Sequence, residues 1–200
     1  MRNVFIFDLD GTITSVETLP LIASHFGVAD RIKELTEATV QGNIPFIESF
    51  IKRVGILGKL PVSQVDSLLG KVPVYEKLNG FLKDHAARCV IATGNLSCWV
   101  DCLAKRIGCT FFSSEAEVKD DQVVRLERIL KKENVVRFFK ESGNKVIFVG
   151  DGNNDVEAMR EADVSIACGL THAPARSVLS VADYLVYHEE ALCRQLNQLC

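Results

Sequence analysis

Asn3-Val-Phe-Ile-Phe-Asp8-Leu-Asp10-Gly-Thr12 is the stretch that decides the fold of this chain. Its apolar residues follow one another without the alternation of a half-exposed strand. Such a run is typical of a strand buried on both faces, at the centre of a parallel sheet. Acidic residues, a glycine and a threonine then end the strand. The stretch therefore predicts a central parallel strand with a polar carboxyl end.

The same pattern recurs further along the chain. Two strong apolar runs cover 88–93 and 145–150, and two weaker ones cover 164–168 and 182–187. Helical periodicity is found between or beside these runs, over 75–86, 96–107, 131–140 and 154–161. Alternating strands and helices predict an α/β fold, a doubly wound parallel sheet with a Rossmann-like core.

The alternation is interrupted between Gly11 and about Lys71, where no strand is predicted. Periodicity and breakers indicate four helices, over 18–26, 29–40, 45–54 and 62–69, with Gly42 and Pro61 among the breakers. About a dozen residues are enough for an ordinary crossover between parallel strands, so this segment is an insertion. We expect a small helical cap over 15–71 and a catalytic core formed by 1–14 and 72–200.

Composition excludes several classes of protein. The 200 residues carry Lys+Arg 23 against Asp+Glu 26, a net charge of −3, and 48% of them are hydrophobic. This balance is typical of a globular domain, not of a disordered or collagen-like chain. The mild acidity and the lack of a dense basic run argue against nucleic-acid binding.

Targeting signals and cysteines give a further expectation about location. No apolar stretch approaches the roughly 20 residues of a membrane-spanning helix, and the start of the chain lacks a signal-peptide pattern. Seven cysteines cannot all pair within the chain, which favours free thiols in a reducing compartment. We expect a cytoplasmic protein without a membrane partner, whose oligomeric state the sequence leaves open.

Polar side chains gather where the strong strands end. The first strand ends in Asp8-Leu-Asp10-Gly-Thr12, the next in Thr93-Gly-Asn95, and a later one in Gly150-Asp-Gly-Asn-Asn-Asp155. Ligands of open parallel sheets bind beyond these carboxyl ends. Four crowded carboxylates repel one another unless a cation compensates them, and Mg²⁺ prefers oxygen ligands together with a substrate phosphate. The pattern therefore indicates phosphoryl transfer, although an acidic turn with a helix cap also accounts for the first motif alone.

Asp8-Leu-Asp10-Gly-Thr12, Thr93 after an apolar strand, an upstream lysine and Gly150-Asp-Gly-Asn-Asn-Asp155 together resemble the haloacid dehalogenase superfamily of phosphatases. All four motifs occur in the order of that superfamily and bracket nearly the whole chain. The helical insertion after the first motif resembles the small cap of the phosphoserine phosphatase branch. The resemblance implies a magnesium-dependent phosphomonoesterase that acts on O-phospho-L-serine through an aspartyl-phosphate.

The resemblance also implies roles for individual residues of the core. Asp8 is the expected nucleophile, and Asp10 is the general acid and then the general base. Mg²⁺ is expected on the Asp8 carboxylate, the Asp10 backbone carbonyl and the Asp151 carboxylate, with Asp155 in support. A second set of residues is expected to hold the phosphate or the rest of the substrate. These residues are Thr93, Gly94, Asn154 and a lysine. Lys132 is the expected lysine because it stands before Glu-Asn-Val-Val, and Lys131 is the alternative. Either lysine could instead be a solvent-exposed residue at the start of a helix, without a role in the site.

The cap carries the expected substrate specificity. Glu17 and Arg53 align with the pair that binds the ammonium and the carboxylate of phosphoserine, and Phe46 aligns with a substrate-contacting aromatic residue. A helix-capping Glu and a surface Arg are the structural alternative. We expect the cap to close over the bound phosphate, with hinges near 14–16 and 71–74.

Departures from the branch leave the substrate open. Gly11 stands where the branch commonly has Ser, Asn95 stands where it has Gly, and Val40 replaces a larger apolar residue. Phosphohomoserine, phosphoethanolamine or a sugar phosphate are alternative substrates with the same mechanism. A dehalogenase and a non-catalytic binding protein are less consistent with the sequence, since Asp10 and the full set of carboxylates are present.

Overall fold

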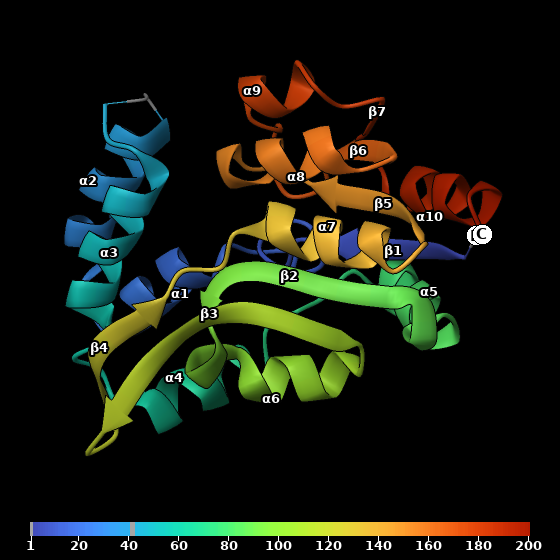
Figure 1. Cartoon of the computed structure of the whole chain (residues 1–200). Coiled ribbons are helices and arrows are strands. Elements are labelled where there is room, and N and C mark those ends of the chain that lie inside the picture. The colour runs from blue at the N-terminus through green and yellow to red at the C-terminus, as the bar shows by residue number, and fades with distance from the viewer. Residues whose placement is uncertain (1, 41–42) are drawn as a thin grey trace.

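The computed structural model describes residues 2–40 and 43–200, and the side chains of Val40 and Phe46 lie outside its described part. Within these residues the strands form one seven-stranded sheet in the order β4-β3-β2-β1-β5-β6-β7 (Figure 1). The strands are β1 (Asn3–Phe7), β2 (Cys89–Leu96), β3 (Thr110–Lys119), β4 (Gln122–Arg128), β5 (Lys145–Gly150), β6 (Val164–Cys168) and β7 (Tyr184–Val186).

Strand β1 lies at the centre of the sheet, as predicted. Phe5 pairs in parallel with Cys89 of β2 on one side and with Ile147 of β5 on the other. The remaining neighbours are also parallel except β3 and β4, which are antiparallel. The doubly wound sheet is therefore confirmed, and the expectation of a purely parallel sheet is corrected at this one edge.

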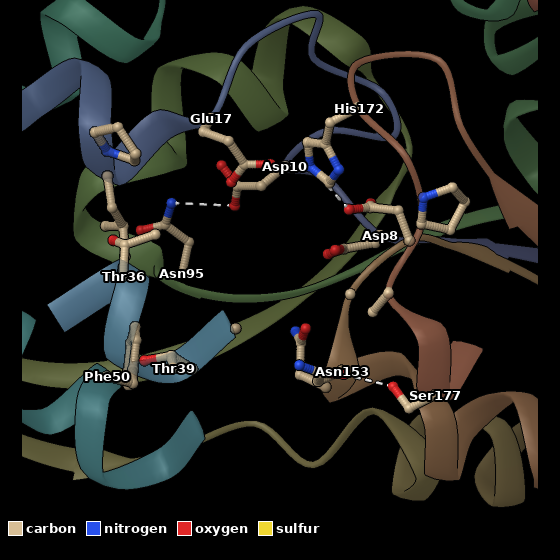
Figure 2. A pocket seen from close by; sticks show the side chains of 18 of the residues that line it. Asp8, Asp10, Glu17, Thr36, Thr39, Phe50, Asn95, Asn153, His172 and Ser177 are labelled. Atoms are coloured by element: carbon tan, nitrogen blue, oxygen red, sulfur yellow. Dashed lines mark hydrogen bonds and ion pairs between the residues drawn. The ribbon is translucent and has the colours of Figure 1, made fainter. Parts of the chain in front are cut away.

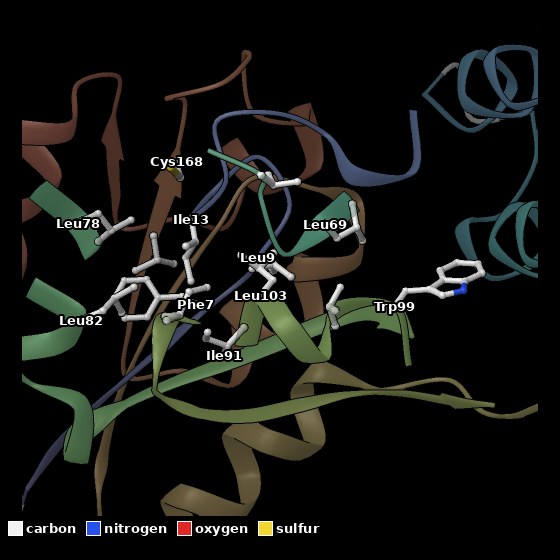
Figure 3. Packing of buried hydrophobic residues seen from close by; sticks show 14 of the residues in the cluster. Phe7, Leu9, Ile13, Leu69, Leu78, Leu82, Ile91, Trp99, Leu103 and Cys168 are labelled. Atoms are coloured by element: carbon white, nitrogen blue, oxygen red, sulfur yellow. The ribbon is translucent and has the colours of Figure 1, made fainter. Parts of the chain in front are cut away.

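Side chains of β1 alternate between two apolar layers. Phe5 and Phe7 belong to a cluster with residues of α5 (Glu76–Asp84), α6 (Ser97–Ile107) and α10 (Glu189–Gln198) (Figure 3). Val4 and Ile6 belong to a second cluster with residues of α7 (Lys132–Glu141), α8 (Val156–Glu161) and α9 (Arg176–Leu179). Two short 3₁₀ helices, η1 (Ala86–Arg88) and η2 (Asn153–Asp155), complete the described elements of the core. Helices thus cover both faces of the sheet, which explains why β1 is apolar at successive positions.

Four helices follow β1 where four were predicted. They are α1 (Thr18–His25), α2 (Ala29–Val40), α3 (Phe46–Leu57) and α4 (Val62–Leu69); the predicted breaker Gly42 lies outside the described residues. Helices α2 and α3 pack on each other at one end of the sheet, whereas α4 packs on α6 (Figure 1). Buried residues of all four helices, among them Ile22, Ile32 and Phe50, share one apolar cluster with Phe5 and Phe7. The division into a cap and a core therefore remains a prediction.

The two connections between the core and these helices lie side by side. Thr14 and Val74 form an antiparallel bridge, and the backbone N–H of Ser15 donates to the Pro73 carbonyl at 3.1 Å. These are the segments in which we expect the hinges. Their pairing means that a hinge movement would involve both connections together.

The hairpin of β3 and β4 was not predicted. Its turn contains Asp120 and Asp121, both with positive φ (51° and 62°), without the glycine that usually indicates such a turn. The turn is attached to the connection between α3 and α4, because Val62 donates to the Asp121 carbonyl and Val123 donates to the Gly58 carbonyl. The hairpin thus attaches the connection between α3 and α4 to the sheet.

Two simpler expectations concern cysteines and membrane helices. All seven cysteines lie in the described part of the chain, and each is a free thiol, as predicted. No helix among the described residues has both the length and the apolar character required to cross a lipid bilayer.

Candidate active site

The predicted polar residues meet at the carboxyl edge of the three central strands. Asp8 follows β1, Gly94 and Asn95 lie at the end of β2, and Asp151 follows β5. Because β2, β1 and β5 are parallel neighbours, their carboxyl ends converge. Figure 2 shows side chains from both the sheet and the helical insertion around the same space. A cavity of about 670 Å³ is found there, and its lining includes Asp8, Asp10, Glu17, Phe50, Arg53, Gly94, Asn95, Asp151, Asn154 and His172.

Lys132 lies behind the cavity, between two carboxylates. Its Nζ is 2.7 Å from Asp8 Oδ1 and 2.6 Å from Asp155 Oδ1, and its side chain is only 2% exposed. Lys131, the alternative, is exposed and precedes the first residue of α7. The first turn of α7 therefore orients Lys132, and not Lys131, toward the predicted nucleophile.

Burial and charge shift the pKa of both partners. Burial raises the pKa of Asp8 well above its usual range, while Lys132 lowers it and the neighbouring carboxylates raise it further. Burial lowers the pKa of Lys132, but Asp155 and Asp8 more than reverse this effect, so its pKa is raised overall. Lys132 is therefore a permanent cation that compensates part of the negative charge on these acids.

Asp155 organises the loop after β5. Its Oδ2 accepts hydrogen bonds from the backbone N–H groups of Asp151 (3.0 Å) and Gly152 (2.9 Å). A Cβ at Gly150 would lie 2.5 Å from the same oxygen, so only glycine leaves room for this carboxylate. Asp155 is fully buried and does not line the cavity; its contacts show how it supports Asp151.

Asp151 offers a second acidic group to the cavity. Its Oδ1 accepts a hydrogen bond from Thr12 Oγ1 at 2.7 Å. Burial and the neighbouring Asp155 raise the pKa of Asp151 to about 7. Oxygen atoms of Asp8, Asp151 and Asp155 all lie within 4.8 Å of one another. Three buried carboxylates with one lysine need further positive charge, and their oxygen-only donor set fits a hard divalent cation.

Asp10 is held at the side of the cavity. Its Oδ1 accepts a hydrogen bond from the backbone N–H of Thr18 at 3.0 Å, and its Oδ2 lies 3.5 Å from Asn95 Nδ2 (Figure 2). Burial, followed by the charge of Glu17, raises the pKa of Asp10. A carboxyl group with a raised pKa next to a nucleophile is suited to proton transfer.

The end of β2 is arranged by hydrogen bonds within the site. Thr93 is fully buried below the cavity surface, 3.5 Å from Asp10 Oδ2, and its hydroxyl accepts the backbone N–H of Asn95 at 3.1 Å. Gly94 lines the cavity, and its carbonyl accepts a hydrogen bond from Ser114 Oγ at 2.7 Å. Sequence reasoning missed Ser114, because it lies on β3, which was not predicted.

The helical insertion contributes the opposite wall. Glu17 precedes α1, while Arg53 and Phe50 lie on α3, and all three line the cavity. Arg53 is buried, so the alternative interpretation of a surface Arg is wrong. Burial lowers its pKa, and the charges of Glu17 and Asp10 act in the opposite direction. The predicted aromatic residue Phe46 has its side chain outside the described part of the structure.

His172 is a site residue that no motif indicated. It lies in the loop after β6, with Nε2 2.8 Å from Glu17 Oε1 and 3.3 Å from Asp151 Oδ2. The hydrogen bond to Glu17 raises the pKa of His172 to about 9. Its position at the cavity could not be predicted from a lone histidine in a loop.

Comparison with known proteins adds a family and several relatives. A family model described as haloacid dehalogenase-like hydrolase matches residues 3–163. The phosphoserine phosphatase of Archaeoglobus fulgidus is 28% identical over 179 residues, which are 83% of this chain and 52% of that protein. The phosphoserine phosphatase of Methanocaldococcus jannaschii is 26% identical over 179 residues, which are 83% of this chain and 85% of that protein. The chain thus spans about half the length of the first relative and most of the second.

A solved structure shows the same fold. It is described as a substrate-bound phosphoserine phosphatase complex and has a TM-score of 0.83 at 23% identity. The comparison covers 100% of this chain and 98% of that one. The sheet and the helices around it are therefore arranged as in that protein.

Proposed function

Because this chain belongs to the haloacid dehalogenase-like hydrolases, we propose that it is a phosphatase that hydrolyses O-phospho-L-serine to L-serine and inorganic phosphate. One observation carries the proposal: a single cavity is lined by the acids Asp8 and Asp10 and by the opposite charges Glu17 and Arg53. An amino-acid phosphate needs both sets of groups, one at its ester and one at its ammonium and carboxylate.

In the first step, Asp8 attacks phosphorus. A bond forms between a carboxylate oxygen of Asp8 and phosphorus while the bond from phosphorus to the serine oxygen breaks. Asp10 donates its proton to the departing serine oxygen. The raised pKa of Asp10 favours the protonated form that this step needs.

In the second step, water attacks the aspartyl-phosphate. Asp10, now ionised, takes a proton from this water, and the bond between the Asp8 oxygen and phosphorus breaks to release phosphate. Lys132 remains beside Asp8 throughout and compensates negative charge on the carboxylate and the phosphoryl group. Thr93 and Gly94 are proposed to hold phosphoryl oxygens at the end of β2, and Asn154 is proposed to contact the substrate from η2.

Asp8, Asp151 and the Asp10 backbone carbonyl are proposed to bind Mg²⁺, with Asp155 holding the Asp151 loop. The bound cation would supply charge compensation for the transferring phosphoryl group. Residues 15–71 are proposed to act as the cap that supplies Glu17 and Arg53.

A substrate panel with Arg53→Ala tests the proposed substrate. We expect O-phospho-L-serine to be the best ester by kcat/KM. Arg53→Ala is expected to raise its KM about 30-fold, the effect of losing a buried charge-assisted contact to the carboxylate. Phosphoethanolamine lacks this carboxylate, so its KM should change little. Inorganic phosphate release measures both.

Lys52→Ala is the control for this comparison. Lys52 lies beside Arg53 on α3, but it is exposed and pairs with Glu48 at 2.7 Å. Its removal should leave both KM values unchanged. A phosphoserine KM that is insensitive to Arg53→Ala would reject the substrate assignment, and the panel would then select among phosphohomoserine, phosphoethanolamine and sugar phosphates.

Magnesium affinity is expected to depend on pH. Ligand carboxylates must lose their protons to bind a cation, and the pKa of Asp151 is about 7 without metal. Burial raises this pKa in the folded state, so the metal-free protein loses stability as pH rises from about 4 to 7. Bound Mg²⁺ should therefore increase the melting temperature more at pH 8 than at pH 6. An equal increase at both pH values in thermal unfolding would contradict the assignment of Asp151 as a ligand.

A further inference from the structure

The loop that carries His172 is attached to both connections of the helical insertion. Thr171 Oγ1 donates a hydrogen bond to the Thr14 carbonyl at 3.2 Å and lies 3.1 Å from the Tyr75 hydroxyl. These contacts fix the loop next to Glu17, which follows Thr14 closely in the chain. His172 then spans the gap between Glu17 and Asp151.

The backbone of Gly11 makes this contact possible. Gly11 has a φ of 71°, and a Cβ there would lie 2.8 Å from Glu17 Oε1, 3.1 Å from His172 Nε2 and 3.2 Å from Asp151 Oδ2. All three polar groups therefore meet directly above a residue without a side chain. Any other residue at position 11 would push at least one of them away.

From this geometry we propose that His172 is a positioning residue that holds the Glu17 carboxylate at the cavity wall for the ammonium group of the substrate. The inference rests on the proposed function and names a residue that sets its specificity. Glu17 and His172 have side chains that are 41% and 43% exposed, so the hydrogen bond between them restricts a glutamate that would otherwise sample several rotamers.

The hydrogen bond leaves Glu17 able to bind a ligand. A carboxylate has two oxygens with about four acceptor positions, and His172 contacts only Oε1. Both ring nitrogens of His172 face acceptors, since Nδ1 lies 3.1 Å from the Ala173 carbonyl. The ring is thus held between the Ala173 carbonyl at Nδ1 and the Glu17 carboxylate at Nε2, which fixes its orientation at the cavity wall. Without this hydrogen bond, the half-exposed Glu17 side chain is free to leave its place above Gly11.

The test compares two esters that differ only in the ammonium. They are O-phospho-L-serine and its deamino analogue, the phosphate ester of hydroxypropanoate, which keeps the same carboxylate and phosphate. His172→Leu is expected to raise the KM of phosphoserine about tenfold, the loss of one hydrogen bond to a charged group, with kcat within about twofold of wild type. The deamino ester should show an unchanged KM.

Two variants separate positioning from damage to the fold. His172→Gln keeps an N–H donor and is expected to recover most of the phosphoserine KM. His188→Leu removes an exposed histidine that does not line the cavity and should behave as wild type. Equal increases in KM for both esters, or a fall in kcat alone, would overturn the proposal.

A double-mutant cycle asks whether His172 acts through Glu17. In a Glu17→Gln background, His172→Leu should have almost no further effect on the phosphoserine KM. Two effects that simply add would show that His172 contacts the substrate or the metal site independently, and the proposal would be wrong.

Crystal structures of the wild type and of His172→Leu separate this inference from the proposed function. If the wild type does not prefer phosphoserine, the proposed substrate is rejected. The position of the Glu17 side chain in the two crystal structures still tests the role of His172. A Glu17 carboxylate that leaves its place above Gly11 in His172→Leu supports positioning. A carboxylate that stays there overturns it.

Discussion

Asp8→Asn protein is expected to release phosphate from O-phospho-L-serine at least about 10⁴-fold more slowly than the wild type, as expected for loss of a covalent nucleophile. A neutral amide cannot form the acyl-phosphate. Among the described residues, the other carboxylate paired with Lys132 Nζ is that of Asp155, which is buried and does not line the cavity. The fold should be retained, because Asn has the shape of Asp and burial of the charged carboxylate is already unfavourable. Phosphate release and thermal unfolding are the two measurements.

Asp101→Asn is the matched control. Asp101 is exposed and pairs with Lys105 on α6, away from the cavity lining. The same chemical change there should leave activity unchanged. If Asp8→Asn kept more than about 1% of wild-type kcat, a direct attack by water would replace the aspartyl-phosphate mechanism.

Lys132→Ala is expected to affect both activity and stability. Its removal leaves Asp8 and Asp155 buried without their shared cation, and breaking a buried ion pair in this way costs about 3–5 kcal/mol. We expect kcat to fall about 10³-fold, because charge compensation at the phosphoryl group is lost as well. Urea unfolding can be followed by the fluorescence of Trp99, the single tryptophan, which is fully buried.

Lys131→Ala provides the comparison at the neighbouring position. Lys131 is exposed at the start of α7, and its removal should change neither kcat nor the unfolding midpoint. A loss of activity in Lys131→Ala with wild-type behaviour of Lys132→Ala would assign the catalytic lysine to position 131.

The central sheet and the acidic edge could be predicted from local patterns. Strands β1, β2 and β5 are apolar at successive positions because both of their faces are covered, and this pattern differs from the one-sided apolar stripe of an amphipathic helix. Asp8 and Asp151 come directly after such strands. Their proximity then follows from the topology of a parallel sheet.

The hairpin of β3 and β4 has no comparable signal. Every residue of β4 is exposed or partly exposed, and charged residues such as Arg125 and Glu127 stand among valine and leucine without a buried run. Its turn uses Asp120 and Asp121 in place of glycine. Local propensity is weak here, and pairing with β3 decides the structure.

The contact between His172 and Glu17 also could not be predicted from local sequence patterns. The two residues are 155 positions apart, and neither belongs to a strand or helix at the contact. The Thr171 hydrogen bonds and the bare backbone of Gly11 allow them to meet. Such a contact depends on tertiary structure, and a search for motifs does not find it.

The central place of β1 has a consequence during synthesis of the chain. Phe5 pairs with Cys89 and Ile147, which follow it by roughly 85 and 140 positions. At about 5–20 residues per second, β5 leaves the ribosome roughly 7–28 s after β1. Until β5 is made, the apolar strand β1 lacks at least one of its two neighbours, whereas α1, α2 and α3 already have contacts with one another. A nascent chain that stalls before β5 therefore keeps an apolar strand with an unpaired edge, which favours aggregation.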